Sequence, residues 1–341
     1  MFIDIFTLLR FLKYQKRFKR IFFFENSFIE PHLAPYIYKN KDFNKTVIIS
    51  FYRIEDKNLK KFQIFQFNKI FFLNFVFLLL KIKYCYSSTP DLDHSAFQRS
   101  VFKLTKYIYI QHSPLGLRKI YRDDAFTNFD LVQVINIFQK NDLNDISKIK
   151  KKKISPWRGK YLFLVKKNKY NFERRDYLEK KKKILIAPTW GTNFFDLNLH
   201  LIIKKNLDPN KYDLFLRPHI MSTKQKTNLI QDLVANNFKI SSGKIDYTHF
   251  DLLITDWSGI YIEFAKIKNI KSILIQNEEK ILNKKLIKYT NETIDSYARK
   301  KLGIIIKPED LYKIENKIDN IFLNKQKHSS EINVFFKDYF Y

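Results

Sequence analysis

The stretch from residue 251 to residue 265, DLLITDWSGIYIEFA, restricts the possible fold of this chain more than any other. It opens with an apolar run of strand length, breaks at a polar turn, and resumes with apolar residues at helical spacing. This pattern predicts a buried strand that runs into a helix, with Ser258 at the N-cap position. In an open α/β sheet, ligands bind beyond the carboxyl ends of the strands, where a helix N-terminus favours an anion. The alternative is an ordinary strand-to-helix turn capped by serine.

The same alternation of short strands and helices extends along the chain. Strands are predicted in the first half at residues 45–51 and 107–111, and residues 69–84 predict a helix that leads into a strand. The second half predicts a helix at residues 222–236, capped by Ser222 or Thr223. Its predicted strands are residues 183–188, 212–217, 238–241, 251–255 and 271–276. Such alternation favours parallel, doubly wound sheets, so we expect an α/β protein with two Rossmann-like domains that face each other across a cleft.

A polar, lysine-rich segment from Asn141 to Lys153 separates the two halves. It ends in KIKKKK, and runs of this kind are more often solvated connectors than binding sites. The expected domains are therefore residues 1–155 and residues 156–341.

Four predicted strand ends carry polar side chains, at the place where doubly wound proteins bind ligands. One such cluster is often structural, but four at equivalent positions predict a site. Asp256 either orients a ligand or caps the following helix, and Glu263 either contacts a ligand or faces the solvent. The candidate residues are His112, Thr189, Arg217, His219, Thr255, Asp256, Ser258 and Glu263.

The chemistry of these candidates is coherent. Arg217 offers a planar fork of donors suited to phosphate, and His219 shares its face if the strand continues. With a helix N-terminus at Ser258, these residues form a predicted diphosphate cradle. His112, in the other half, is a candidate general base because imidazole titrates near neutrality. Its alternative role is a hydrogen bond to the nearby loop.

Several classes of protein are excluded by missing motifs. The chain contains no GxxxxGK[ST] and no GxGxxG, which argues against a P-loop enzyme and against a dinucleotide oxidoreductase with the usual fingerprint. It contains no HExxH or comparable metal-binding spacing, so no metal and no cofactor are expected. The single cysteine, Cys85, excludes an internal disulfide framework and a Cys-rich zinc site.

The formal charge of +29 at pH 7 is compatible with a nucleic-acid partner. However, the chain is also crowded with Phe, Tyr, Ile and Asn, which AT-rich codons specify alongside Lys, so we predict no nucleic-acid binding. Residues 1–24 interleave basic and apolar side chains and predict a basic amphipathic helix on an anionic membrane surface. The alternative is a helix packed on its own domain with solvated lysines.

Two further features bear on where the protein resides. No segment reaches the roughly 20 apolar residues that a transmembrane helix needs. The basic stretch at the N-terminus follows the apolar one instead of preceding it, unlike a secretory signal. We therefore expect a cytoplasmic protein, peripheral on the inner face of the cell membrane.

Five segments together resemble one known family, the CDP-glycerol glycerophosphotransferases related to teichoic-acid primases and polymerases. The resemblance covers roughly residues 87–311 and follows the order of the family's motifs. It implies the GT-B architecture and transfer of a polyol phosphate from a CDP-activated donor to a hydroxyl of a membrane-linked or polysaccharide acceptor. The segments are SSTPDLD, ILIAPTWG, LRPH, DLLITDWSGIYIEFA and YARKKLGIIIKPEDL.

The resemblance also implies roles for individual residues. His112 looks like the histidine proposed to deprotonate the acceptor, and Arg217 with His219 looks like the pair that neutralises the donor diphosphate. Thr189 matches the hydroxyl of the first strand end in the second domain. Thr255, Asp256 and Ser258 match the motif that contacts donor phosphate and glycerol. The implied mechanism is direct displacement at the β-phosphorus with CMP leaving. Two positions depart from the family pattern, Ser113 in place of glycine and Ile220 in place of proline.

Two other functions remain open. A GT-B glycosyltransferase that uses a nucleotide sugar needs the same phosphate cradle and differs only in its donor. A non-catalytic basic protein that binds nucleic acid or an anionic membrane accounts for the charge, but it has no need of four polar strand ends.

Overall fold

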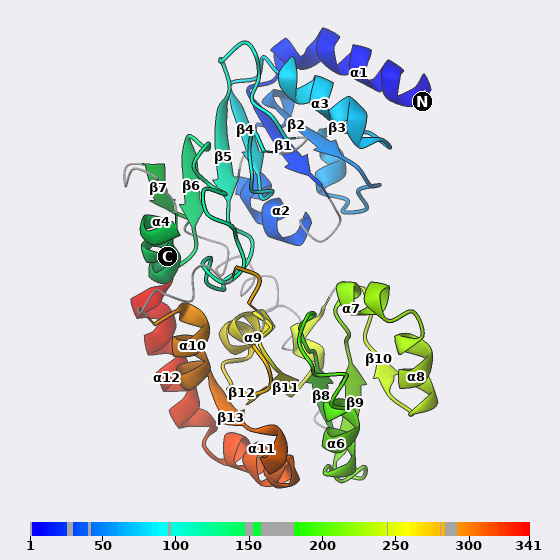
Figure 1. Cartoon of the computed structure of the whole chain (residues 1–341), viewed down its shortest axis with the longest axis vertical. Coiled ribbons are helices and arrows are strands. Elements are labelled where there is room, and N and C mark those ends of the chain that lie inside the picture. Colours follow the sequence, from blue (N-terminus) through cyan, green and yellow to red (C-terminus); the bar gives the residue numbers. More distant parts are fainter. Residues whose placement is uncertain are drawn as a thin grey trace. The chain divides into compact units, whose positions relative to one another are not determined.

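The computed structural model describes residues 2–25, 30–39, 42–94, 97–146, 153–157, 181–243, 245–279, 281–283 and 292–341. The chain divides into two compact units, Met1–Lys160 together with Tyr341, and Tyr161–Phe340 (Figure 1). Residues 147–152 of the predicted lysine-rich connector lie outside the described residues. Its beginning is not a connector, because residues 141–146 complete helix α4 (Ile137–Ile146).

The first unit is built on a parallel sheet of seven strands in the order β3-β2-β1-β4-β5-β6-β7. Its central strands are buried along nearly their whole length, as expected of a sheet that is covered on both faces. In β1, for example, Phe22 and Phe24 are fully buried, and Phe22 stacks on Tyr86 with a centroid distance of 4.7 Å. The strands are β1 (Arg20–Phe24), β2 (Thr46–Ser50), β3 (Gln63–Gln66), β4 (Tyr84–Ser87), β5 (Lys106–Ile110), β6 (Leu131–Val134) and β7 (Ile154–Pro156).

The described helices of the first unit connect these strands. Helix α1 (Phe2–Tyr14) precedes β1 and contacts α3 (Ile70–Leu78), which leads into β4. Helix α2 (Glu30–Lys39) joins β1 to β2, and α4 follows β6. Short 3₁₀ turns are η1 (Gln15–Arg17), η2 (Phe43–Lys45) and η3 (Leu59–Lys61).

The second unit has a parallel sheet of six strands in the order β10-β9-β8-β11-β12-β13. Counted within the unit, this order is 3-2-1-4-5-6, in which the direction of winding reverses between the first strand, β8, and the fourth, β11. That reversal is the switch point where open α/β sheets bind ligands. The strands are β8 (Lys182–Ile186), β9 (Tyr212–Leu216), β10 (Lys239–Ile240), β11 (Leu252–Thr255), β12 (Ser272–Ile275) and β13 (Gly303–Ile306).

The helices described in the second unit follow the strands in turn. Helix α6 (Leu199–Lys205) follows β8, α7 (Ile220–Gln225) and α8 (Leu229–Ala235) follow β9, and α9 (Ile260–Lys268) follows β11. The C-terminal part comprises α10 (Ile294–Leu302), η7 (Pro308–Lys313), α11 (Ile314–Leu323) and α12 (Lys325–Tyr339), and η5 (Tyr247–His249) precedes β11. None of the helices in the described part of the chain has both the length and the apolar character needed to cross a bilayer.

The predicted α/β class with doubly wound parallel sheets is confirmed, but two local predictions were wrong. The N-terminal helix ends at Tyr14 and residues 20–24 form β1, because the aromatic run there is buried in the sheet rather than exposed on a helix. The helix predicted at residues 222–236 is two helices separated at residues 226–228.

Candidate functional site

The loops after β8 and β11 diverge at the switch point of the second unit. The two strands pair in parallel with Ile186 opposite Ile254, so the loops that follow them leave the sheet at the same edge. The loop after β8 turns at Gly191, whose φ of 73° lies in the left-handed region that favours glycine. The sequence TWGTN after β8 and DWSG after β11 therefore supply neighbouring polar groups.

Asp256 holds these two loops together. Its Oδ1 accepts the backbone N–H of Thr189 at 2.7 Å, and its Oδ2 accepts the Thr192 hydroxyl at 2.8 Å. The side chain is fully buried, and this burial raises the pKa of Asp256, opposed by the hydrogen bonds from Thr189 and Thr192. The carboxylate thus faces inward, and its observed role is to position the loop after β8.

Thr255 also turns inward, whereas Ser258 does not. Thr255 is fully buried and its hydroxyl donates to the Ala187 carbonyl at 2.6 Å. The prediction that Ser258 caps the following helix was wrong, because α9 begins one residue later than expected. Its N-cap is Gly259, which has no side-chain oxygen to accept a hydrogen bond. The half-buried Ser258 hydroxyl has no hydrogen-bonding partner among the described residues.

Arg217 and His219 lie beyond the end of β9, next to the loop after β8. The strand ends at Leu216, so the condition under which both side chains would share one face, a continuing strand, is not met. Arg217 donates through Nη2 to the Gly243 carbonyl at 2.6 Å, and burial lowers the pKa of its guanidinium. His219 is the N-cap of α7, where its Nδ1 accepts the Met221 N–H at 3.1 Å.

The cap at His219 replaces the caps predicted at Ser222 and Thr223, which lie inside α7. The exposed His219 ring faces Trp190 of the loop after β8, with 6.1 Å between ring centroids. His219 therefore stands beside the switch point, held by its own helix.

Glu263 forms a hydrogen bond within the protein. It is half-buried on α9, and its Oε2 accepts the Tyr247 hydroxyl at 2.6 Å. This bond connects α9 to η5, so the observed contact of Glu263 is within the protein.

A pocket of about 320 Å³ opens beside the loop after β8, within the second unit. Its walls come from that loop, from α7 and from the segment after β12. The hydroxyls of Thr189 and Ser222 have no hydrogen-bonding partner among the described residues, and Ser222 is buried. Lys226 is the one cation among the described lining residues and pairs with Asp196 at the surface. The lining residues are Thr189, Gly191, Thr192, Asn193, Phe195, Asp196, Ser222, Gln225, Lys226 and Glu278.

The structure thus separates the predicted residues by position. Thr189 lines the pocket, whereas Thr255 and Asp256 are buried and hydrogen-bond to the segment after β8 that contains Thr189. Arg217 and His219 occupy the adjacent strand end. Sequence reasoning missed Lys226, although it lies only seven residues after the LRPH segment.

A second residue missed from the sequence is Arg299 on α10. It is almost completely buried, and its guanidinium donates to the carbonyls of Asp256 and Ile275, the latter at 3.0 Å. The same group lies 4.1 Å from the centroid of the Trp257 ring. Arg299 therefore ties the ends of β11 and β12 together. In the sequence, Arg299 is followed by two lysines in YARKKLG, a pattern typical of the solvent-exposed side of a helix.

His112 lies in the first unit, directly after β5. It is half-buried, and its backbone N–H donates to Gln111 Oε1 at 3.2 Å. The loop that follows is held by α4, where Gln139 Nε2 donates to the carbonyls of Ser113 and Leu115 at 2.7 and 2.9 Å. Ser113 is not among the described non-glycine residues with positive φ, so a serine fits the backbone at this position.

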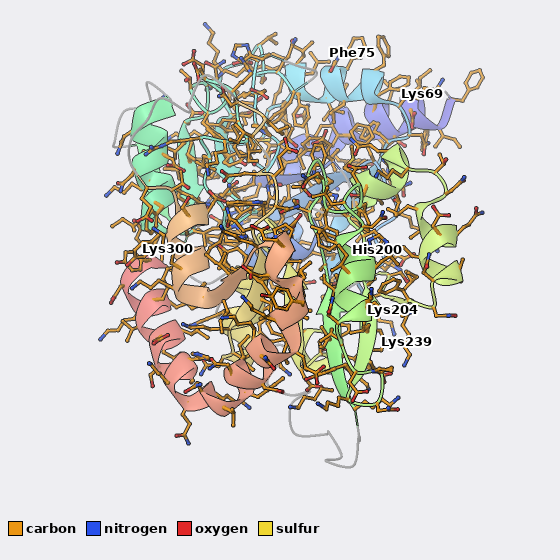
Figure 2. The ribbon with its side chains drawn as sticks, turned by 60° about the horizontal axis from the view of Figure 1, so that its bottom comes forward. Lys69, Phe75, His200, Lys204, Lys239 and Lys300 are labelled. Atoms are coloured by element: carbon orange, nitrogen blue, oxygen red, sulfur yellow. The ribbon has the colours of Figure 1, made fainter. Side chains whose placement is uncertain are left out.

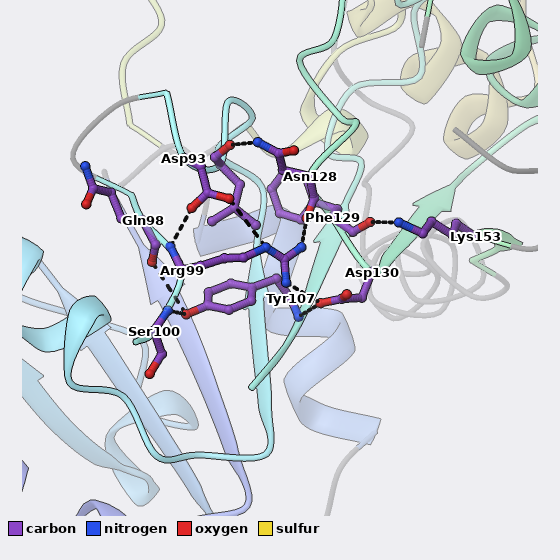
Figure 3. A network of polar contacts seen from close by, with 10 residues as sticks. Asp93, Gln98, Arg99, Ser100, Tyr107, Asn128, Phe129, Asp130 and Lys153 are labelled. Carbon is purple, nitrogen blue, oxygen red and sulfur yellow. Dashed lines mark hydrogen bonds and ion pairs between the residues drawn. The ribbon is translucent and has the colours of Figure 1, made fainter. Parts of the chain in front are cut away.

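The acidic segment after β4 is used structurally. Asp91 pairs with Arg122 at 2.5 Å, and Asp93 pairs with Arg99 at 3.4 Å. Arg99 also reaches Asp130, which accepts the Tyr107 N–H at 2.8 Å (Figure 3). Among the residues that the structure describes, no group of three or more His, Cys, Asp or Glu side chains is placed to hold a metal ion.

Comparison with protein-family models and with curated protein sequences found no match. Solved structures do resemble the chain. The wall teichoic acid polymerase TagF has a TM-score of 0.58 at 13% identity, covering 98% of this chain and 92% of that one. HepE from Anabaena, in complex with UDP and glucose, has a TM-score of 0.56 at 10% identity, covering 92% of both chains. The chain has a GT-B-like fold. At these identities the likeness concerns the fold alone, and the chemistry depends on the site.

Proposed function

We propose that the chain transfers glycerol phosphate, or a related polyol phosphate, from a CDP-activated donor to a hydroxyl of a cell-surface polysaccharide or a lipid-linked acceptor. The observation that carries the proposal is the pocket at the switch point of the second unit, lined by Thr189, Ser222 and Lys226. Its volume of about 320 Å³ is at the lower end of typical ligand pockets. Hydroxyls and one cation suit a phosphorylated ligand.

Two observations support a CDP-activated donor. The motifs of the chain resemble CDP-glycerol glycerophosphotransferases, and TagF, which shares the fold, has been solved after a soak with CDPG. In the proposed donor complex, Lys226, Arg217 and His219 neutralise the diphosphate. Thr189 and Ser258 contact the phosphate and glycerol groups.

The proposed reaction is a single displacement. The acceptor oxygen forms a bond to the β-phosphorus, the bond from that phosphorus to the CMP oxygen breaks, and CMP leaves. We propose His112 as the base that takes the proton of the acceptor hydroxyl, the role that the family resemblance implies. The protein contributes positioning and charge stabilisation, which supply most of the catalysis in phosphoryl transfer.

The test is thermal stabilisation of the full chain by CDP-glycerol, CDP-ribitol, CMP, UDP-glucose and a DNA duplex. A ligand that binds only the folded state raises the melting temperature. We expect the largest shift with a CDP-polyol. A shift with UDP-glucose alone would identify a glycosyltransferase instead, and a shift with DNA alone would leave the transferase proposal without support.

A matched pair of variants localises the binding. Lys226→Gln removes the pocket cation, and Lys300→Gln removes a similarly exposed lysine that pairs with Glu292 on the surface. We expect Lys226→Gln to weaken CDP-glycerol binding about tenfold, the effect of losing one charge-assisted hydrogen bond. Lys300→Gln should bind like the parent protein. Equal affinity of both variants would place the donor outside this pocket.

A further inference from the structure

Helix α1 differs from an ordinary amphipathic surface helix because it exposes a large part of its apolar residues. Its Asp4 is buried, whereas Phe2, Ile3 and Phe6 are 84%, 71% and 70% exposed. Surface helices of globular proteins normally bury their apolar side chains and expose their charges. The alternative of a helix packed on its own domain with solvated lysines holds for the inner side of α1, where Phe11 is fully buried against Phe65 while Lys13 is exposed. It does not account for the exposed Phe2, Ile3 and Phe6.

Two buried polar residues fix α1 alongside α3. Near the start of α1, Asp4 accepts the backbone N–H groups of Asn68 and Lys69, at 3.0 and 3.2 Å, directly before α3. Just after the end of α1, Gln15 donates to the Leu79 carbonyl at 3.1 Å and accepts the Lys81 N–H at 2.8 Å. The helices are held side by side at both ends (Figure 1), so their outer sides form one rigid surface.

Helix α3 contributes a second apolar strip to this surface. Its sequence IFFLNFVFL is apolar nearly all round, and Phe71 is 60% exposed. Phe75 of α3 and Lys69, the residue directly before this helix, are both exposed (Figure 2). The exposed apolar residues of the two helices, here called the α1–α3 surface, are Phe2, Ile3, Ile5, Phe6, Leu9, Phe71 and Phe75.

The charges around the α1–α3 surface are of one sign. Residues 2–24, 57–90 and 97–108 contain a single acidic residue, Asp4, which is buried. Exposed cations surround the aromatic side chains, and they are Arg10, Lys13, Lys16, Arg17, Lys69, Lys81 and Lys103. An apolar face with a cationic rim complements an anionic lipid surface. A second copy of the chain would bring like charges together, which is unfavourable.

We infer that the α1–α3 surface inserts into the interface of an anionic lipid bilayer. The aromatic side chains enter the boundary between headgroups and acyl chains, and the cations contact the headgroups. This inference rests on the first unit alone and does not depend on the proposed transferase activity.

The experiment is flotation of the full chain with vesicles of phosphatidylcholine and phosphatidylglycerol, and with vesicles of phosphatidylcholine alone. We expect binding to the anionic vesicles and at least a tenfold weaker association with the neutral ones, because each interfacial cation contributes about fivefold. Raised salt should weaken the binding.

Three double variants separate the elements. Phe6→Ser with Leu9→Ser changes α1, and Phe71→Ser with Phe75→Ser changes α3. Leu323→Ser with Val334→Ser changes residues of the second unit that are 85% and 58% exposed. The first two variants should each lose about tenfold or more in vesicle binding, and the third should bind like the parent. All substituted side chains are exposed, so unchanged melting temperatures are expected.

Each contrary result would overturn the inference. The contrary results are absence of binding to anionic vesicles, unchanged binding in either of the first two variants, and an equal loss of binding in the control variant. The oligomeric state, measured by light scattering, provides the last test. A dimer of the parent that the Phe71 and Phe75 substitutions convert to a monomer would show that a second copy covers the surface.

Discussion

The carboxylate of Asp256 accepts the backbone N–H of Thr189 across the switch point, at 2.7 Å. The two residues are 67 positions apart in the chain, yet this bond sets the start of the loop that lines the pocket. A residue that resembles a donor ligand in the sequence is thus a positioning residue in the structure. Its substitution should change the shape of the pocket through Thr189 and Thr192.

Replacing Asp256 with alanine should destabilise the second unit by about 2–4 kcal/mol, because it leaves buried donors unpaired and creates a cavity. Chemical denaturation followed by tryptophan fluorescence measures this free energy of unfolding. Asp208→Ala is the control, since Asp208 accepts a backbone N–H in an exposed turn, and it should cost less than about 1 kcal/mol. Equal costs for the two variants would mean that the buried bonds contribute little.

The pH dependence of stability should report on the same carboxylate. Burial raises the pKa of Asp256 in the folded protein above its ordinary value. A raised folded-state pKa gives a contribution that is fully present below the unfolded pKa, about 3.9, and is lost as pH rises through the folded value. The free energy of unfolding of the parent, minus that of Asp256→Asn, should therefore fall with rising pH and level off above the folded pKa. A difference that rises with pH would contradict this assignment.

Arg299→Lys should weaken the link between the ends of β11 and β12. Lysine has no planar fork and cannot reach the acceptors of Arg299 together. The expected cost is about 1–3 kcal/mol, with a change in Trp257 emission because the guanidinium lies over that ring. Lys300→Arg, on the exposed side of the same helix, should stay within about 0.5 kcal/mol of the parent. An unaltered spectrum and stability in Arg299→Lys would show that the fork is dispensable.

The loop after His112 depends on a buried ion pair. Arg118 and Asp142 meet at 2.8 Å with both side chains almost inaccessible, and Asp142 also accepts the Leu117 N–H at 2.7 Å. Asp142→Asn should destabilise the first unit by about 3–5 kcal/mol, because it leaves a buried cation uncompensated. Calorimetry should show one transition lowered and the other retained. Asp310→Asn, in an exposed pair with Lys313, should cost less than about 1 kcal/mol.

The sequence predicted the strand-end pattern well because apolar runs of strand length and their polar ends are local signals. It failed where a local pattern is compatible with both a helix and a strand. The run RIFFF was assigned to a helix because basic and apolar residues precede it, and only its burial in the sheet shows it to be β1. The strands β3, β6, β7 and β13 were also missed from the sequence.

The site was predictable in its location but not in its side-chain directions. Thr255 and Asp256 point inward because the segment after β8 offers them the Ala187 carbonyl and the Thr189 N–H. Such partners lie more than 60 residues away in the sequence. Arg299 was missed since its acceptors are backbone carbonyls of other segments, which no spacing reveals.

The most direct measurement is CMP formation from CDP-glycerol by the parent chain and by His219→Asn. CMP is released whichever hydroxyl attacks, water included, so the acceptor need not be known. Asparagine is a good N-cap and can replace the acceptor that His219 provides to α7, so the melting temperature should be unchanged. The account predicts CMP formation by the parent and a loss of about a hundredfold or more in His219→Asn. Equal rates in the two proteins, or no CMP formed by the parent while UDP-glucose is consumed, would contradict it.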